Sequence, residues 1–427
     1  MMNSLSHAYG RMVLFALPVL FMLVLKPATV HGQYSSNSLY SLYGIGDLVP
    51  NSSAKTSGLG RTGLALRSEG FLNTLNPASY TAFGTNDVLI DAGFSGYYST
   101  YESRGQLESA TDMNLDHFSL GFPVTKWWGA IVGLSPFSEI GYDIITSSVF
   151  EGSLDALETR FTGSGGISRF YFSNSFFPVE QLSFGINISY LMGTLEQTET
   201  SKLSNLGFYD FNTLNKFYLR NFYVGFGLLY DQALKDDHLS LGITFYPRQI
   251  LSAKYTHEIS VSGDEETILY RETESVHGFD LPGAFNAGIC YDVNSKFKII
   301  ADYGLQRWSG NSALIDVISY TDRYSYRFGL EYLPNPIDPL TFFQKVEYRL
   351  GAYCENSYIL MRENRIKDYG ITIGLGIPLQ NRKSKINFSL ELGQLGTLSN
   401  GLVRERYAGF SLDFALSDIW FRKRKFE

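Results

Sequence analysis

The chain contains 427 residues, including 29 tyrosines, 32 phenylalanines and 41 glycines, and only 18% of its residues are charged. Its formal net charge of −7 argues against nucleic acid as a partner, because polyanions bind to basic surfaces. A composition rich in aromatic residues and glycine and poor in charge is typical of a barrel whose outer surface faces lipid.

The first 32 residues have the pattern of a cleaved export signal. Residues 12–25 form an apolar run that follows Arg11 and precedes Lys26, and small residues then lead to Gly32. A membrane anchor helix would need about 20 apolar residues, and Pro18 interrupts this run. We therefore expect residues 1–32 to be a signal peptide.

Later in the chain no apolar run reaches the length of a membrane-spanning helix, so strands would have to cross a membrane. Many segments alternate with period 2. In residues 183–193, large apolar side chains alternate with Ser, Gly and Asn. A soluble sandwich, the alternative, would carry Lys, Glu, Arg and Asp on its polar face. Small neutral residues instead favour an enclosed lumen, and hence an all-β outer-membrane barrel.

Turn signals divide residues 87–416 into about 14 antiparallel strands. The predicted spans are 87–103, 110–123, 128–149, 156–177, 180–199, 213–232, 237–262, 267–292, 296–308, 323–333, 342–356, 367–378, 385–396 and 405–416. Every second connection is short, as periplasmic turns are, and the others are mostly longer and more polar. This alternation predicts both ends of the barrel domain on the periplasmic side.

Residues 33–86 lack the strand pattern and are rich in Ser, Gly and Asn. A lumen of about 14 strands would leak without filling, so we predict an N-terminal plug, or hatch, at 33–86. A disordered periplasmic extension is the alternative. Residues 417–427 are predicted to form a basic periplasmic tail, either resting on lipid headgroups or solvated.

Two hatch motifs resemble those of a known family. The segments Gly58-Leu-Gly-Arg-Thr-Gly-Leu-Ala-Leu66 and Leu75-Asn-Pro-Ala-Ser-Tyr80 are similar to the hatch of the FadL/TodX long-chain fatty acid transporter family. The resemblance implies that hydrophobic molecules pass through a hatch-lined pocket and leave sideways at a kink in the third strand. Pro136 lies in the third predicted strand. Alternatively, it marks a loose outer rim, because Pro247 lies at a similar height in the seventh strand.

The resemblance assigns ligand passage to apolar hatch residues, to one of two arginines that could pair with a carboxylate headgroup, to the Asn-Pro-Ala motif and to the kink. These candidates are Leu59, Arg61, Leu64, Arg67, Phe71, Leu72, Asn76, Pro77, Ala78 and Pro136. Packing of the hatch against the barrel wall explains the hatch residues equally well.

Three further groups of residues bear on whether the chain has a charged lumen, a catalytic pair or a metal site. Lys345, Glu347 and Arg349 share a strand face and predict a charge ladder in the lumen, which would pair with the hatch or guide a substrate. His117 and Ser119 lie two residues apart on one strand, about 7 Å, which is too far for a catalytic pair. We therefore expect no enzyme activity, and the histidine spacing predicts no metal site or other cofactor.

The two cysteines, Cys290 and Cys354, are predicted to point to opposite faces of the barrel wall, which disfavours a disulfide between them.

The expected function is passive transport of small hydrophobic molecules, such as long-chain fatty acids, across the outer membrane of a diderm bacterium. Expected partners are outer-membrane lipid, a hydrophobic ligand and the barrel-assembly machinery during biogenesis, and the expected state is a monomer. The alternative is a non-transporting scaffold that resembles the PorV-type barrels of the type 9 secretion system. Polar external loops of modest length favour transport over a scaffold.

Overall fold

The computed structural model describes residues 38–83, 87–103, 105–149, 156–203, 210–263, 265–309, 319–361, 363–379 and 383–419. The expected signal peptide, 1–32, and the part of the expected tail from residue 420 onward lie outside these ranges. Within them, no helix is long and apolar enough to cross a membrane.

The described chain is almost entirely strand. The strands are β1 (Asp47–Leu48), β2 (Asp87–Ser103), β3 (Gln106–Thr125), β4 (Trp128–Val149), β5 (Ala156–Val179), β6 (Leu182–Leu203), β7 (Asp210–Leu234), β8 (Asp237–Tyr246), β9 (Gln249–Ser262), β10 (Glu266–Leu281), β11 (Ala284–Val293), β12 (Phe297–Gln306), β13 (Ser319–Tyr320), β14 (Arg323–Tyr332), β15 (Glu347–Met361), β16 (Asn364–Pro378), β17 (Lys385–Gly396) and β18 (Arg404–Ile419). Short helical turns are η1 (Leu39–Leu42), α2 (Ala54–Ser57), η2 (Pro77–Ala82), η3 (Phe342–Gln344) and η4 (Ser399–Gly401).

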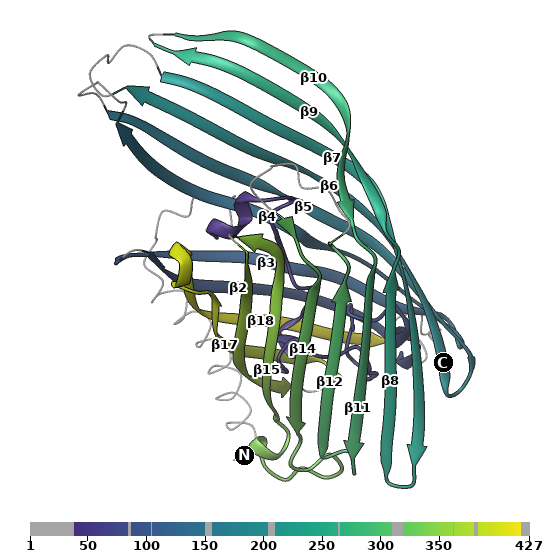
Figure 1. Cartoon of the computed structure of the whole chain (residues 1–427). Coiled ribbons are helices and arrows are strands. Elements are labelled where there is room, and N and C mark those ends of the chain that lie inside the picture. The colour runs from purple at the N-terminus through teal and green to yellow at the C-terminus, as the bar shows by residue number, and fades with distance from the viewer. Residues whose placement is uncertain are drawn as a thin grey trace, which may run out of the picture. The chain divides into compact units, whose positions relative to one another are not determined.

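These strands form a closed antiparallel barrel, in which β18 pairs with β2 (Figure 1). Breaks at Pro247–Arg248 and at Pro282–Gly283 divide two wall strands into β8 with β9 and β10 with β11. Counting each divided strand once, and leaving out the hatch strand β1 and the two-residue β13, the wall has 14 strands. The predicted 14-stranded barrel is confirmed.

Many predicted strand boundaries differ from the structure by a few residues, and two of the differences change the description of the chain. The strand predicted at 342–356 begins at Glu347, because Thr341 and Gln344 cap the helical turn η3 and bend the chain before it. The last strand extends beyond 416, since Ile419 still pairs with Asp87 of β2. The first residues of the expected tail, 417–419, are therefore part of the barrel wall.

The two faces of the wall have the polarity expected for lipid outside and protein inside. In β17, Leu390 and Leu392 point outward and are 42% and 58% exposed, whereas Ser389 and Glu391 point inward and are 1% and 4% exposed. A soluble protein has the opposite arrangement. The exposed apolar face and the buried polar face place this barrel in the outer-membrane class.

One side of the barrel is much longer than the other. The strands β4 to β7 contain 22 to 25 residues, whereas about 9 to 11 are enough to cross a bilayer. Above the Ala284–Gln306 pair that ends the β11–β12 ladder, β10 continues and pairs only with β9 among the described strands. We call the outer parts of β4, β5, β6, β7, β9 and β10 the projecting sheet, which rises toward the upper left in Figure 1.

An apolar core lies against the inner face of the projecting sheet. It is formed by Ile45, Ile140, Tyr142, Ile167, Leu191, Leu195, Leu219, Tyr223, Leu251, Ala253, Phe279, Leu281, Trp308, Tyr358 and Ile359. Ile45 comes from the N-terminal segment, so this core joins that segment to the projecting sheet by packing.

A charge on the outward face should destabilise the barrel in lipid. We expect Leu390→Arg to lower the free energy of unfolding by about 2–4 kcal/mol if the residue lies near the bilayer centre. The measurement is urea unfolding in lipid vesicles. The matched control, Leu398→Arg, changes a similarly exposed leucine in the connection after β17 and should have a much smaller effect. Equal stability of the Leu390→Arg variant and the unmodified protein would contradict a lipid-facing wall.

Candidate functional site: the hatch and a lateral opening

Residues 38–83, called the hatch below, lie inside the barrel and contact lumen-facing groups around its circumference. The Gly60 amide donates to the Thr372 hydroxyl on β16 at 2.9 Å, and the Gly63 amide donates to the Asp302 carboxylate on β12 at 2.7 Å. On the far wall, the Ser175 hydroxyl of β5 donates to the Ala78 carbonyl at 2.9 Å. The hatch is therefore attached to both sides of the lumen.

Arg61 is the most extensively paired residue of the hatch. Its guanidinium donates to Glu391 Oε1 at 2.6 Å and to Asp368 Oδ2 at 3.2 Å, and it lies 4.1 Å from the ring centre of Tyr353. The neighbouring Gly60 allows this approach, because a Cβ there would lie 2.6 Å from the Ala352 amide nitrogen. Glu355 Oε1 also lies 3.9 Å from the guanidinium, which is thus already paired with three carboxylates of the wall.

Arg67, the other arginine proposed for a ligand headgroup, is also engaged. It lies 3.5 Å from the Asp231 carboxylate and donates to the Thr81 carbonyl at 3.3 Å. Its side chain is 21% exposed, so this pair is more open to solvent than that of Arg61.

The Asn-Pro-Ala motif forms a local cap and a wall contact. The Asn76 side chain accepts from the Ala78 amide at 3.0 Å, which begins η2, and donates to the Leu64 carbonyl at 2.8 Å. Pro77 packs so closely on the wall that a Cβ at Gly185 would lie 2.2 Å from its carbonyl carbon. The motif therefore fixes the end of the hatch against β6.

The apolar candidates are buried in two small cores between hatch and wall. Leu59 packs with Cys290 and Ile300, and Leu72 packs with Tyr80, as parts of the clusters Leu59, Ala65, Leu66, Cys290, Ile300 and Leu72, Tyr80, Leu89, Ile131, Tyr171. Leu64 and Phe71 are 5% and 7% exposed, and the Lys55 ammonium lies 4.8 Å from the Phe71 ring centre. In this structure these side chains contact protein.

Two of the three residues of the predicted charge ladder, Glu347 and Arg349, interact in the lumen, and the third, Lys345, does not. Glu347 and Arg349 pair in the lumen, where Arg349 also donates to Glu331 at 2.9 Å. The Lys55 ammonium of the hatch lies 3.7 Å from the Glu331 carboxylate. Lys345 lies at the end of η3 and is exposed, away from this network. The network therefore ties the hatch to the wall, and its central carboxylate, Glu331, was not among the predicted residues.

Ser119 and His117, which are not expected from the sequence to form a catalytic pair, each face another partner in the described geometry. The Ser119 hydroxyl hydrogen bonds with the Tyr171 hydroxyl at 2.7 Å, and His117 faces Asp91 at 3.4 Å. Both cysteines are free, with Cys290 buried and Cys354 exposed, as predicted. Within the described ranges, His, Cys, Asp and Glu form no group of three that could hold a metal ion.

The barrel wall opens between β3 and β4. Their ladder runs from the Thr125–Trp128 pair to the Phe118–Leu134 pair and ends there. Beyond that point β3 stays with β2 and β4 stays with β5, and the two strands diverge in Figure 1. Pro136 follows directly, at a bulge in the β4–β5 register. Because proline lacks an N–H donor and bends a strand, it accounts for the separation.

The hatch partly covers the freed edge of β4. Its strand β1 pairs Asp47 with Glu139 and Leu48 with Ser138, and the Val49 amide donates to the Phe137 carbonyl at 3.1 Å. Gly46 precedes β1 with φ +85°, and a Cβ there would lie 2.3 Å from the Glu139 carbonyl oxygen. Only glycine lets the hatch approach β4 this closely.

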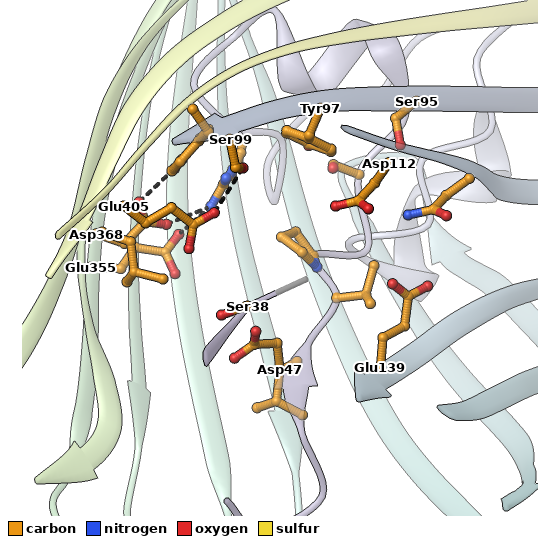
Figure 2. Close-up of a pocket in the computed structure, with 18 of the residues that line it drawn as sticks. Ser38, Asp47, Ser95, Tyr97, Ser99, Asp112, Glu139, Glu355, Asp368 and Glu405 are labelled. Atoms are coloured by element: carbon orange, nitrogen blue, oxygen red, sulfur yellow. Dashed lines mark hydrogen bonds and ion pairs between the residues drawn. The ribbon is translucent and has the colours of Figure 1, made fainter. Parts of the chain in front are cut away.

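A cavity of about 250 Å³ lies at this opening (Figure 2). Its wall contains many more acidic than basic side chains. The acidic residues are Asp47, Asp112, Asp116, Glu139, Glu355, Asp368 and Glu405, and the basic residues are Arg61 and Arg323. A cavity of this composition has a negative potential and suits cationic groups better than hydrocarbon.

The carboxylates of the cavity differ in how they are compensated. Glu355 accepts from Arg323 at 2.6 Å and from Arg327 at 2.9 Å. Asp116 and Glu405 accept from serine hydroxyls, at 2.5 and 2.9 Å. Burial raises the pKa of Asp47 to about 6, and the nearby Glu139 acts in the same direction. Four of the seven acidic residues of the cavity, Asp47, Asp112, Asp116 and Glu139, belong to β1, β3 and β4.

This acidic opening was not predicted, although part of its signal is local. Glu108, Asp112 and Asp116 recur every fourth residue in residues 106–117, a stretch without Lys or Arg. Such spacing places them on one face of a strand. Asp47 and Glu139 come from distant segments and join the cluster only through the β1–β4 pairing.

The fold and the site together define an outer-membrane barrel of the FadL/TodX type, with a hatch and a lateral opening. The BamG family model matches residues 14–427, so the chain belongs to the BamG family. None of the curated proteins compared with the chain matches it.

Solved structures with the same fold include three transporters or channels of low sequence identity. The Pseudomonas putida toluene transporter TodX is 15% identical, with a TM-score of 0.60 over 88% of this chain and 100% of that one. The Ralstonia pickettii toluene transporter TbuX is 14% identical, with a TM-score of 0.59 over 86% and 98%. The CymD monoaromatic hydrocarbon channel is 14% identical, with a TM-score of 0.57 over 88% and 99%.

Removal of Arg61 should loosen the hatch, because Glu391 would keep a buried charge without its partner. We expect Arg61→Ala to destabilise the seated hatch by about 3–5 kcal/mol. Hydrogen exchange of hatch amides in detergent measures this free energy. Arg67→Ala is the matched control. Because the ion pair of Arg67 with Asp231 is more exposed to solvent, this variant should destabilise the seated hatch by less than about 1 kcal/mol. Equal protection in the two variants would contradict the anchoring role of Arg61.

The hatch strand β1 should be held less firmly as the pH rises. The seated Asp47 keeps its proton up to about pH 6, whereas a released hatch loses it near the ordinary pKa of 3.8. Raising the pH through this window therefore favours release, by up to about a hundredfold in the opening equilibrium.

Hydrogen exchange of the amides of residues 47–49 at pH 4.5 and pH 8, corrected for the intrinsic rate, tests this shift. Asp47→Asn should show the same protection at both pH values. A loss of protection at pH 8 in this variant as large as that in the unmodified protein would assign the effect to another group.

Proposed function

We propose that this protein is an outer-membrane scaffold that works with the barrel-assembly machinery and binds a protein partner at its open outer end. The single observation that carries the proposal is the acidic lining of the lateral opening, behind a hatch whose candidate ligand residues all contact protein. The name of the BamG family refers to barrel assembly, which supports this choice of partner.

The chemistry of the opening disfavours a hydrophobic ligand. A hydrocarbon in the cavity would desolvate the carboxylates that line it without offering a hydrogen bond in return. Sites for small apolar ligands are lined mainly by apolar side chains with a few placed polar groups. At the opening, polar and charged residues outnumber apolar ones in the lining of the cavity.

The anchoring of the hatch supports a permanent plug. To open a path along the hatch, Arg61 would have to leave Glu391 and Asp368, and Lys55 would have to leave Glu331. Each separation leaves buried charge uncompensated, at a cost of several kcal/mol. A scaffold needs a sealed barrel, and these ion pairs supply the seal.

The projecting sheet supplies a surface for a protein partner. Strands of 22 to 25 residues extend beyond the length needed to cross the bilayer and form a continuous sheet above the wall. The sequence also allowed a scaffold for a secretion system, which is the same kind of function with a different partner.

Passive transport of hydrophobic molecules, such as long-chain fatty acids, is the second candidate. The specific observation in its favour is the separation of β3 from β4 at Pro136, the strand at which the FadL/TodX resemblance implies a lateral exit. The shared fold of the toluene transporters supports the same candidate. The transport path would then have to pass the acidic cavity.

Uptake in vesicles separates the two functions. The protein is reconstituted in lipid vesicles, and entry of toluene and of a fluorescent fatty acid is timed against protein-free vesicles. We expect no acceleration by the unmodified protein. Arg61→Ala, with its loosened hatch, serves as the comparison for an opened lumen. Entry that is at least about tenfold faster with the unmodified protein would favour transport and contradict the scaffold.

Association with the machinery is the positive test. After purification from native membranes in mild detergent, subunits of the barrel-assembly machinery should be enriched at least about tenfold over an unrelated barrel of similar abundance. Depletion of the protein should also lower the amount of other barrels in the outer membrane. Failure of both effects would overturn the proposed function.

A further inference from the structure

The outer half of β3 has a strand neighbour on one side only among the described residues. From Gln106 to His117 this strand pairs with β2, and on its other side no described strand pairs with it, since the β3–β4 ladder ends at the Phe118–Leu134 pair. The hatch strand β1 pairs with β4 and leaves the β3 edge open. At about 3.4 Å per residue, the edge is roughly 40 Å long. Exposed edges of this kind are templates for pairing with another strand.

Proline and lysine, which commonly protect an edge, are absent from residues 106–117, and the charges of this stretch are all acidic: Glu108, Asp112 and Asp116. These acids would repel an acidic strand and attract a basic one, and the single register shift lies near Asp116, at the inner end. The edge of β10 differs, because two bulges interrupt its register and Arg271 lies among its acids. Natural proteins use bulges and charges to block edge pairing. By this comparison β3 is the more receptive edge.

The two faces of the β3 edge differ sharply in chemistry. Leu107, Met113 and Leu115 point outward and are 69%, 72% and 49% exposed. The alternate positions carry the acids, and Asp112 and Asp116 line the cavity shown in Figure 2. A strand that added to this edge would have its own side chains beside these two rows.

We propose that the β3 edge binds an extended segment of a partner protein in which Lys or Arg, facing the lumen, alternates with apolar residues facing outward. The basic side chains would lie beside Asp112 and Asp116, with Glu139 and Asp47 across the opening. Backbone pairing gives affinity, and alternate side chains give specificity. The inference rests on the proposed function in that it names the kind of partner the scaffold would hold.

Two other occupants fit less well. A second copy of this chain pairing through β3 would bring acidic faces together, which repels. The basic residues Arg422 to Lys425 of the chain follow Ile419 by three to six residues, a reach of at most about 20 Å. Ile419 pairs with Asp87, whereas Asp112 pairs with Tyr97, about 34 Å farther along β2. These basic residues reach at most the inner end of the edge and do not extend to Asp112 or beyond it.

The test uses the full chain in detergent and a labelled peptide of about ten residues in which Lys alternates with Val. Binding is measured by fluorescence anisotropy. We expect saturable binding, and we expect it to weaken roughly tenfold or more in the variant with Glu108→Gln, Asp112→Asn and Asp116→Asn. The matched control removes three acids from the projecting sheet and its margin, with Glu265→Gln, Glu272→Gln and Glu274→Gln, and should bind as the unmodified protein does.

Two control peptides test the geometry. A peptide in which Glu alternates with Val should not bind, because its charge has the wrong sign. The Lys–Val peptide methylated on every backbone nitrogen keeps its charge but has no N–H donor, and it should also fail. Equal binding of the methylated peptide, or equal weakening in both acid-to-amide variants, would overturn edge addition in favour of unspecific charge attraction.

The outcome can be separated from that of the proposed function. Loss of peptide binding with continued enrichment of the assembly machinery would reject the β3 edge alone and leave the scaffold function in place. Specific peptide binding without any enrichment would reject the assembly function and leave the edge as a docking site for another partner. In intact cells, a photocrosslinking residue at Thr111 should attach to segments of alternating basic and apolar sequence, and attachment only to other sequences would contradict the proposal.

Discussion

A strand in lipid must have its backbone N–H and C=O groups paired, and the rest of this structure depends on how that constraint is met. Closure between β18 and β2 removes the sheet edges from the wall. Above the Phe118–Leu134 pair the closure fails, because Pro136 bends β4 away from β3. The hatch strand β1 then pairs with the freed edge of β4. The same backbone hydrogen bonds therefore hold the hatch in place and cover part of the opening.

Buried ion pairs help to hold the hatch in a place where charge is costly to move. Apolar contacts such as that of Leu59 with Ile300 tolerate small shifts, whereas the pair of Arg61 with Glu391 requires a fixed geometry. Since a buried ion pair is stabilising only while both partners remain together, the network favours one seated position over a range of intermediate ones. The barrel thus combines a hatch anchored by ion pairs with an opening in its wall.

Much of the fold was predictable from sequence, because the alternation of apolar and polar side chains along a strand can be read from neighbouring residues alone. The predicted spans 128–149 and 385–396 coincide with β4 and β17. The partners of Arg61 were not predictable, since barrel register brings Asp368 and Glu391 to it from about 300 residues away. Lys345 was misplaced because the prediction continued one strand through it, whereas η3 ends there and changes the direction of the chain.

The paired breaks at Pro247–Arg248 and Pro282–Gly283 have a mechanical consequence. Both interrupt the wall at one level, since Tyr246 pairs with Ala284 just below them. The projecting sheet is therefore joined to the barrel by unbroken strands only through β4 to β7. A load applied at its outer rim is transmitted along those four strands, and β4 delivers it to the hatch through β1. The outer rim of the projecting sheet and the hatch are therefore mechanically coupled through β4 and β1.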